Sequence, residues 1–212
     1  QCLAVGEVEM AVKQGFLAPQ EIAGELGQVL AGQKPGRTGD GDITVFDTTG
    51  IALQVLEAGE RIRAGMPAGE IAKEMQAIVP HCHASFILDT LEFMKAGGRC
   101  SSLVAFGANL LSLKPCIEVD NADGSMHVGK KYRGTLKKVL PQYVKDKLAQ
   151  YPSIKRDHLF ITYSTIDPSY VELVRQTVEE TMKFKEIHTT NASCTIACHC
   201  GPNTLGVLFM TK

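Results

Sequence analysis

The stretch from Ser193 to Met210 constrains the fold of this chain more than any other. It reads S-C-T-I-A-C-H-C-G-P-N-T-L-G-V-L-F-M, with small and β-branched residues first and an apolar run last. Residues 195–197 and 207–210 each have the composition of a buried strand. Between them, residues 201–203 (Gly-Pro-Asn) predict a turn, because glycine and asparagine both accept positive φ. We therefore expect two strands joined by a tight turn, with His199 at its tip.

His199 is the first candidate for a binding residue. A histidine at the tip of such a turn lies beside open backbone N–H groups, and this arrangement suits an anion. The alternative is a turn histidine without a binding role, and the pattern of this stretch alone leaves both interpretations open.

Size and charge set limits on the function. A chain of 212 residues is long enough for one large domain or two small ones. The formal net charge of −1 argues against nucleic acid or an anionic membrane as a bulk partner. No apolar run approaches the ~20 residues of a membrane span. The first residues lack the basic region and apolar core of a secretory signal, so we expect a cytoplasmic protein without integral membrane association.

The cysteines raise the question of a metal site. Their odd number, seven, favours reduced thiols over a disulfide framework. Cys194, Cys198, His199 and Cys200 resemble a zinc-ligand cluster, but no second ligand pair follows at a finger-like spacing. Residues 81–83 (His-Cys-His) would add ligands only if the fold brought them close. We therefore expect no metal and no cofactor.

The apolar periodicity changes along the chain. Helical patterns at 3–14, 19–32, 51–64 and 68–78 alternate with a strand at 43–46, which is typical of a parallel sheet covered by helices. After Ala84 we expect strands at 85–88, 115–119, 125–128, 158–164 and 187–190 and helices at 90–95, 103–113, 135–149 and 167–182. The Asp-Gly pair at 123–124 predicts a hairpin turn. The prediction is an α/β fold, with a small N-terminal α/β (Rossmann-like) layer at 1–82 packed on a larger α+β domain at 83–212.

Four motifs from about residue 55 onward occur in an order that resembles the DegV family. They are L-E-F-M-K-A-G-G-R at 91–99, L-K-P followed by the hairpin, K-K-Y-R-G at 130–134, and H-C-G-P-N-T-L-G at 199–206. That family consists of two-domain α/β proteins that hold a fatty acid and present it to a partner kinase. The resemblance implies a DegV-like fold with a mixed sheet and a non-enzymatic, lipid-binding function.

The resemblance also implies which residues bind. It places the ligand-binding residues at the head-group end of an apolar cavity: Gly98, Arg99, His199 and Gly201. It implies apolar lining by residues such as Phe86, Leu103, Phe106, Leu110 and Phe209. It further indicates a docking surface for the fatty-acid kinase, made of Lys130, Lys131 and Arg133. The alternatives are a surface arginine at 99 and a solvated basic turn at 130–134.

The first 54 residues resemble another family, the ornithine cyclodeaminase/mu-crystallin family of NAD(P)-dependent enzymes and binding proteins. The similarity rests on G-E-V-E-M-A-V-K-Q-G-F-L, E-I-A-G-E-L-G-Q-V-L-A-G-Q-K-P-G-R-T and D-I-T-V-F-D-T-T-G-I-A-L-Q. The chain therefore looks like a composite, or chimera, with a seam near Gln54. It lacks the G-x-G-x-x-G dinucleotide fingerprint, so this segment is expected to act as scaffold.

The chain departs from the DegV pattern in several places. The N-terminal Ser/Thr motifs that grip the fatty-acid carboxylate in that family are missing. Cys198 replaces the usual Thr, Asn203 the usual Gly, and Cys100 an aliphatic residue. Three hypotheses remain open: a fatty-acid-binding protein, an NAD(P)-binding cyclodeaminase-like protein, and a scaffold that binds nothing. A homo-oligomer is compatible with each of them.

Overall fold

The computed structural model describes residues 32–35, 52–96, 113–121 and 124–212. The chain divides into two compact units, residues 1–78 and 79–212. The elements expected before residue 51, and the body of the helix expected at 103–113, lie outside the described residues. Within the part of the chain that is described, no helix is both long and apolar enough to cross a membrane.

In the first unit, two helices form a hairpin: α3 (Ala52–Arg63) and α4 (Ala68–Ile78). Gly65, at φ 78°, ends α3. Its N–H donates to the Ile62 carbonyl, and the N–H of Met66 donates to the Arg61 carbonyl, both at 3.0 Å. This pair of bonds is a Schellman motif, which satisfies carbonyl groups left open at the helix end. The Arg61 side chain also reaches across to Glu74 of α4 at 2.5 Å.

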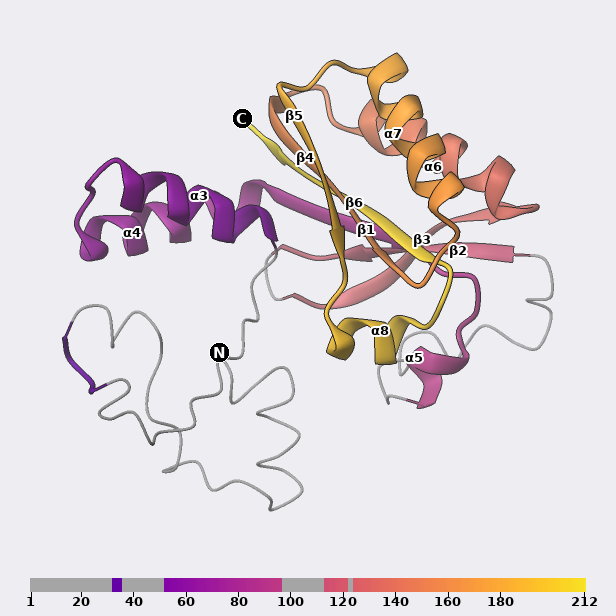
Figure 1. Ribbon diagram of the computed structural model, residues 1–212, viewed down its shortest axis with the longest axis horizontal. Helices are drawn as coiled ribbons and strands as arrows, with labels where there is room; N and C mark the ends of the chain where they lie inside the picture. The colour runs from indigo at the N-terminus through magenta and orange to yellow at the C-terminus, as the bar shows by residue number, and fades with distance from the viewer. Residues whose placement is uncertain (1–31, 36–51, 97–112, 122–123) are drawn as a thin grey trace. The chain divides into compact units, whose positions relative to one another are not determined.

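The second unit is built on a six-stranded mixed sheet with the order β3-β2-β1-β6-β4-β5 (Figure 1). Its strands are β1 (Cys82–Ile87), β2 (Leu113–Val119), β3 (Met126–Arg133), β4 (Ile154–Ser164), β5 (Glu186–Asn191) and β6 (Thr204–Thr211). A short 3₁₀ turn, η2 (Val79–His81), precedes β1. The β4–β5 pair is parallel and the other pairs are antiparallel. The mixed sheet expected from the sequence is therefore confirmed.

Strand β6 lies at the centre of this sheet. It pairs with β1 on one side, where Val207 faces Ser85, and with β4 on the other, where Val207 faces Ile161. All but the last residue of β6 are buried. The apolar run at the end of the opening sequence stretch is thus a buried strand, as predicted, and the structure adds that this strand is central.

Two helices cover one face of the sheet: α6 (Leu136–Gln150) and α7 (Pro168–Thr181). Figure 1 shows them side by side. Asp167 caps α7 by accepting a hydrogen bond from the N–H of Ser169 at 2.8 Å, as the sequence predicts. The core on this face includes Tyr143, Val174, Leu159 and Phe209.

The opposite face carries two short helices, α5 (Glu92–Ala96) and α8 (Cys194–Cys200). A smaller apolar cluster forms here from Leu88, Met94, Ile117 and Cys200. Phe86 packs against this cluster, whereas Phe209 belongs to the core under α6 and α7. Phe86 and Phe209 therefore lie on opposite faces of the sheet, so at most one of them can line a given cavity.

The strand expected at 195–197 is also wrong, because these residues form part of α8. Ser193 begins this helix by accepting a hydrogen bond from the N–H of Ile196 at 3.4 Å. The cap satisfies a backbone group that a strand would have paired with a neighbour. The β-branched residues after it favour a strand only weakly, so the cap and the following glycine decide the local structure. The stretch is a helix, a turn and a strand.

Candidate functional site

The candidate site is centred on the turn between α8 and β6. Gly201 ends the helix with φ 76° and ψ −179°, and its N–H donates to the Ala197 carbonyl at 2.8 Å. This backbone conformation is open essentially to glycine alone. A Cβ at this position would lie 2.4 Å from the ring of Phe93 on α5. Gly201 is therefore required both by the backbone and by the close approach of the aromatic ring.

Side chains from other elements hold this turn in place. The hydroxyl of Ser164, at the end of β4, donates to the Gly201 carbonyl. Asn203 has φ 58°, the positive value expected from the sequence, and its N–H donates to the Thr165 carbonyl at 3.0 Å. Its amide also donates to the Asp89 carboxylate at 3.1 Å, and Asp89 forms an ion pair with Lys114. The turn is thus anchored at both ends.

Asn203 thereby acquires a role that the DegV resemblance did not give it. The family pattern has glycine at this position, and the replacement leaves the positive-φ conformation intact because asparagine tolerates it. In return, the asparagine amide joins the turn to Asp89, which follows the end of β1. This departure from the pattern therefore preserves the shape of the turn.

His199 lies in the last turn of α8, one residue before the end of the helix, and is half-buried. It is not at the tip of a turn between two strands, as the sequence had indicated. Ile196 lies three positions earlier, and residues at this spacing share one face of a helix. The side chain of Ile196 is 49% exposed and that of Phe93 on the neighbouring α5 is 38% exposed. His199 is thus placed beside apolar surface.

Two of the other predicted ligand-binding residues, Gly98 and Arg99, lie outside the described residues. So do the predicted lining residues Leu103, Phe106 and Leu110. The structure therefore brings together His199 and Gly201 from the predicted set, and the position of Arg99 relative to them stays a prediction.

The basic residues Lys130, Lys131 and Arg133 lie in strand β3 at the edge of the sheet, and all three are exposed. The strand expected at 125–128 is too short, because β3 continues through Arg133. Burial of Tyr132 explains the longer strand, because this residue is 3% exposed and belongs to the core cluster that includes residues of α6. The Lys130 ammonium forms an ion pair with Asp146 of α6 at 2.6 Å.

A small cavity lies on β1 and β2 beside α6. Its volume is about 20 Å³, enough for one water molecule. The lining includes His83, Glu118, Lys147, Tyr151 and Phe209. Burial lowers the pKa of His83, with His81 and Lys147 adding repulsion. This cavity is too small for an acyl chain.

The cysteines of the cluster that resembles a zinc site differ in their exposure to solvent. Cys198 is exposed, whereas Cys200 is buried in the apolar cluster under α8. Among the described residues, the group with metal-ligand spacing is instead His158, Glu186 and His188, on β4 and β5. Sequence reasoning missed it. The available signal was Glu186-Ile187-His188, in which the two ligand types alternate along a strand and so share one face.

Comparison with known families identifies the chain. Residues 27–212 match the family described as "Uncharacterised protein, DegV family". The chain belongs to the DegV family. A DegV domain-containing protein of Deinococcus radiodurans is 28% identical over 194 residues, covering 88% of this chain and 66% of that protein. Two further DegV relatives are each covered over 59% of their length, so the chain spans less than two thirds of these proteins.

Solved DegV structures share the fold. A fatty-acid-binding DegV protein of Thermus thermophilus is 28% identical with a TM-score of 0.67, over 82% of this chain and 62% of that one. The fatty acid kinase B3 protein of Streptococcus pneumoniae, solved loaded with linoleic acid, is 17% identical with a TM-score of 0.64, over 76% of this chain and 55% of that one. The expected DegV resemblance and mixed α/β fold are therefore confirmed.

Part of the segment 1–54, which the sequence had indicated to be of another family, also matches DegV. The DegV match begins at residue 27, inside the part that resembles the cyclodeaminase family. An alanine dehydrogenase of Archaeoglobus fulgidus is 43% identical over 49 residues, which is 23% of this chain and 15% of that enzyme. The composite interpretation rests on this short similarity alone.

Proposed function

We propose that this DegV protein binds a long-chain fatty acid, with the carboxylate at the turn after α8 and the acyl chain against apolar surface of α5 and α8. The observation that carries the proposal is the position of His199 at this anchored turn, next to the exposed apolar side chains of Ile196 and Phe93. A fatty acid needs such a pairing, because its head group is an anion and its tail is entirely apolar.

The chemistry of the turn fits a carboxylate. An imidazolium can donate a charge-assisted hydrogen bond, which is stronger than a neutral one. Because Gly201 has no side chain, the Phe93 ring can lie close to the backbone of the turn. The tail supplies most of the affinity: at ~0.8 kcal/mol per buried CH₂, a long acyl chain gains about 11 kcal/mol before ordering costs. Arg99 is proposed as the second head-group donor, because its planar fork matches a carboxylate.

The relatives support this proposal. The T. thermophilus DegV protein, described as fatty-acid binding, is 28% identical over most of this chain. The chain spans only part of its relatives, so fatty-acid binding is to be tested on the 212-residue chain itself.

Titration with a fluorescent fatty acid tests the site. The His199→Ala variant should bind about 10–100-fold more weakly, the loss expected for one hydrogen bond to a charged group. His127→Ala is the matched control, since His127 is exposed on β3 and lies outside the site. Equal affinity of the wild type and the His199→Ala variant would refute the head-group assignment. Absence of binding by the wild type would refute the function.

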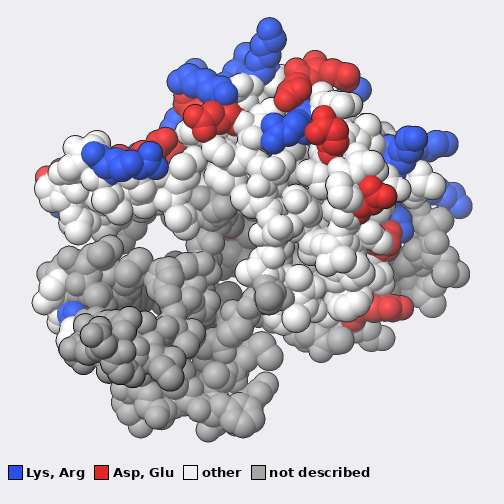
Figure 2. Space-filling view, viewed as in Figure 1, with Lys and Arg blue, Asp and Glu red and all other residues white. Residues whose placement is uncertain are grey.

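We further infer that the protein acts in the cytoplasm as a carrier that presents the fatty acid to a fatty-acid kinase, and is not itself an enzyme. Lys131 and Arg133 are exposed on one face of the edge strand β3 and give a basic surface for docking. Lys130 points to the other face, where it pairs with Asp146. Figure 2 shows positive and negative side chains interspersed on the described surface in view. Electrostatic complementarity mainly raises the association rate and the salt dependence of binding.

The docking proposal has its own test. The double substitution Lys131→Glu and Arg133→Glu should slow phosphorylation of the bound fatty acid by a fatty-acid kinase and leave fatty-acid affinity unchanged. Native mass spectrometry of the purified chain then separates the remaining alternatives. A co-purified fatty acid supports the carrier, a nicotinamide nucleotide supports the cyclodeaminase-like alternative, and a chain without ligand supports the inert scaffold.

A further inference from the structure

Two histidines and a glutamate meet on the parallel strand pair β4–β5. His158 faces Glu186 across the two strands, and Phe160 faces His188. Side chains two positions apart on a strand point to the same face, so His158, Glu186 and His188 share one face. The neighbours Leu159 and Ile161 point the other way, into the core beneath α6 and α7. The three side chains therefore lie on the face opposite those helices.

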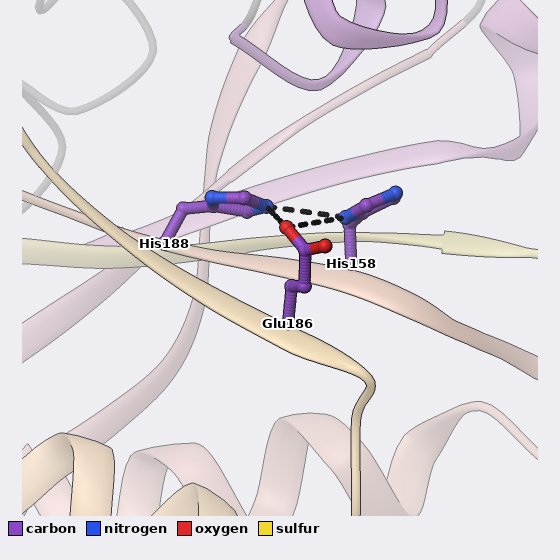
Figure 3. Close-up of side chains that lie close together, drawn as sticks. All are labelled: His158, Glu186 and His188. Atoms are coloured by element: carbon purple, nitrogen blue, oxygen red, sulfur yellow. Dashed lines mark hydrogen bonds and ion pairs between the residues drawn. The ribbon is translucent and has the colours of Figure 1, made fainter. Parts of the chain in front are cut away.

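The distances within this group are short. The Nδ1 atom of His158 and the Nε2 atom of His188 are 3.1 Å apart. The Oε2 atom of Glu186 lies 3.4 Å from His188 Nε2 and 3.9 Å from His158 Nδ1. Figure 3 shows the two ring nitrogens turned toward one another with the carboxylate oxygen beside them.

We propose that His158, Glu186 and His188 bind a divalent first-row transition metal ion, with zinc as the type case. A point equidistant from the three atoms lies about 2.0 Å from each, which matches the ~2.0–2.2 Å of zinc–imidazole and zinc–carboxylate bonds. Two imidazoles and one carboxylate are the ligand set of known zinc and iron sites. The three protein ligands leave at least one coordination position for water or another small ligand.

The sheet holds these ligands in position. The His188 ring stacks on Phe160 with 4.6 Å between ring centroids and 26° between planes. Beyond this pair, the hydroxyls of Thr162 and Thr190 form a hydrogen bond of 2.9 Å across the same two strands. Arg175 of α7 donates a hydrogen bond to the Ile187 carbonyl at 3.1 Å and so holds β5 from the opposite face of the sheet. Ligands on strands supported in this way need little rearrangement to bind an ion.

Access and charge also suit an ion. The side chains of His158, His188 and Glu186 are 13%, 29% and 62% exposed. The site is therefore open to solvent at the carboxylate and enclosed at the imidazoles. Without metal, one ring donates its N–H to the other across this 3.1 Å contact. A metal ion would take the place of that proton and accept a lone pair from each ring.

Zinc titration of the metal-free 212-residue chain, followed by calorimetry, tests the proposal. The wild type should bind one Zn²⁺ through this site, and the melting temperature should rise with zinc. His188→Gln and Glu186→Gln should each weaken zinc binding by more than the ~10–100-fold that loss of an outer-shell partner causes. Because Glu186 is mostly exposed, Glu186→Gln is expected to fold normally, which circular dichroism checks.

Two control variants separate this site from other ligands. His127→Gln removes an exposed histidine outside the group, and Cys198→Ser removes the exposed thiol of α8. Neither should change the zinc affinity of the β4–β5 site. The Co²⁺ form should show the spectrum of nitrogen and oxygen ligands without a thiolate charge-transfer band. Unchanged zinc affinity in both His188→Gln and Glu186→Gln, or loss of binding only in Cys198→Ser, would overturn the proposal.

Discussion

The hydroxyl of Tyr143 donates a hydrogen bond to the backbone carbonyl of Ser85 at 2.7 Å. The same oxygen accepts a hydrogen bond from the N–H of Val207 at 3.1 Å. Ser85 and Val207 are opposite residues in the β1–β6 pair, so one side chain of α6 bridges two strands. Helix and sheet are thus joined by a polar contact inside an apolar core.

Removing this hydroxyl should destabilise the fold. Tyr143→Phe keeps the ring and leaves buried backbone groups without their partner, so the free energy of unfolding should fall by about 1–3 kcal/mol. Urea unfolding followed by circular dichroism measures the change. Tyr170→Phe is the control, since Tyr170 is only half-buried on α7, and should alter stability by less than about 0.5 kcal/mol. Equal stability of the Tyr143→Phe variant and the wild type would contradict the bridging role.

The protein should also lose stability in alkali. Burial raises the pKa of Tyr143 well above its ordinary value, and burial followed by the hydrogen bond to Asp146 raises the pKa of Tyr132. In the unfolded chain both phenols ionise near pH ~10. Above that pH the unfolded state releases protons that the folded state retains, so unfolding becomes easier as pH rises. Urea midpoints should therefore fall as pH rises above the phenol pKa of the unfolded chain, and less steeply in Tyr143→Phe.

Lys147 and Glu118 form a pair that a double-mutant cycle can resolve. Their charged groups are 2.7 Å apart, with the lysine side chain 5% and the glutamate side chain 21% exposed. Glu118→Gln leaves the buried ammonium without its counter-charge and should cost about 3 kcal/mol, near the lower bound for breaking a buried pair. The double variant Lys147→Met with Glu118→Gln should recover most of that loss. Additive costs would show that the two charges are not coupled.

The turn at Gly201 should tolerate no side chain. Gly201→Ala forces a conformation that alanine avoids and drives Cβ into the Phe93 ring, so we expect a loss of about 2–6 kcal/mol. Phe93→Ala relieves only the steric part, so it should cost less in the Gly201→Ala background than in the wild type. Gly69→Ala is the control, because Gly69 lies in the exposed helix α4 with open space around it. That change should be neutral or stabilising.

Thiol labelling should separate the cysteines. Burial raises the pKa of the Cys116 thiol to about 12, and Cys82 and Cys200 are also buried. Cys198 is exposed. Iodoacetamide near neutral pH should therefore modify Cys198 in the native protein well before these three, and all four should react in urea. Peptide mass spectrometry reads the sites. Rapid native labelling of Cys116 would mean that β1 and β2 open more readily than the packing indicates.

Local sequence signals predicted elements with strong periodicity or clear caps. Asp167-Pro168 marked the start of α7, and the positive φ of Gly201 and Asn203 followed from residue type alone. The signal was ambiguous where propensity and capping disagree. Thr195-Ile196 favours a strand by composition, yet Ser193 starts a helix there. Strand β3 was predicted too short because the pairing of Lys131 with Pro115 is a contact between strands, which local pattern does not contain.

Part of the site could be predicted and part could not. His199 and Gly201 could be proposed because a histidine before a Gly-Pro turn is a local pattern, and their binding role stays a prediction. Their support by Ser164, Asp89 and Phe93 comes from three other elements and depends on the fold. The His158–Glu186–His188 group escaped notice because it spans two strands that α7 separates in the chain.

The central position of β6 determines when the sheet can be completed during synthesis of the chain. His83 next to the start of β1 and Thr211 at the end of β6 form a hydrogen bond although 128 positions separate them. At a synthesis rate of ~5–20 residues per second, β1 waits about 6–25 s on the ribosome before its second partner, β6, is complete. Strands β4 and β5 are made during this interval but cannot yet pair with the β3-β2-β1 half of the sheet. In the described sheet, β6 lies between that half and the β4–β5 pair. The edge of β1 that later pairs with β6 therefore has the longest exposure of unpaired backbone groups. We expect a chaperone to bind there during synthesis.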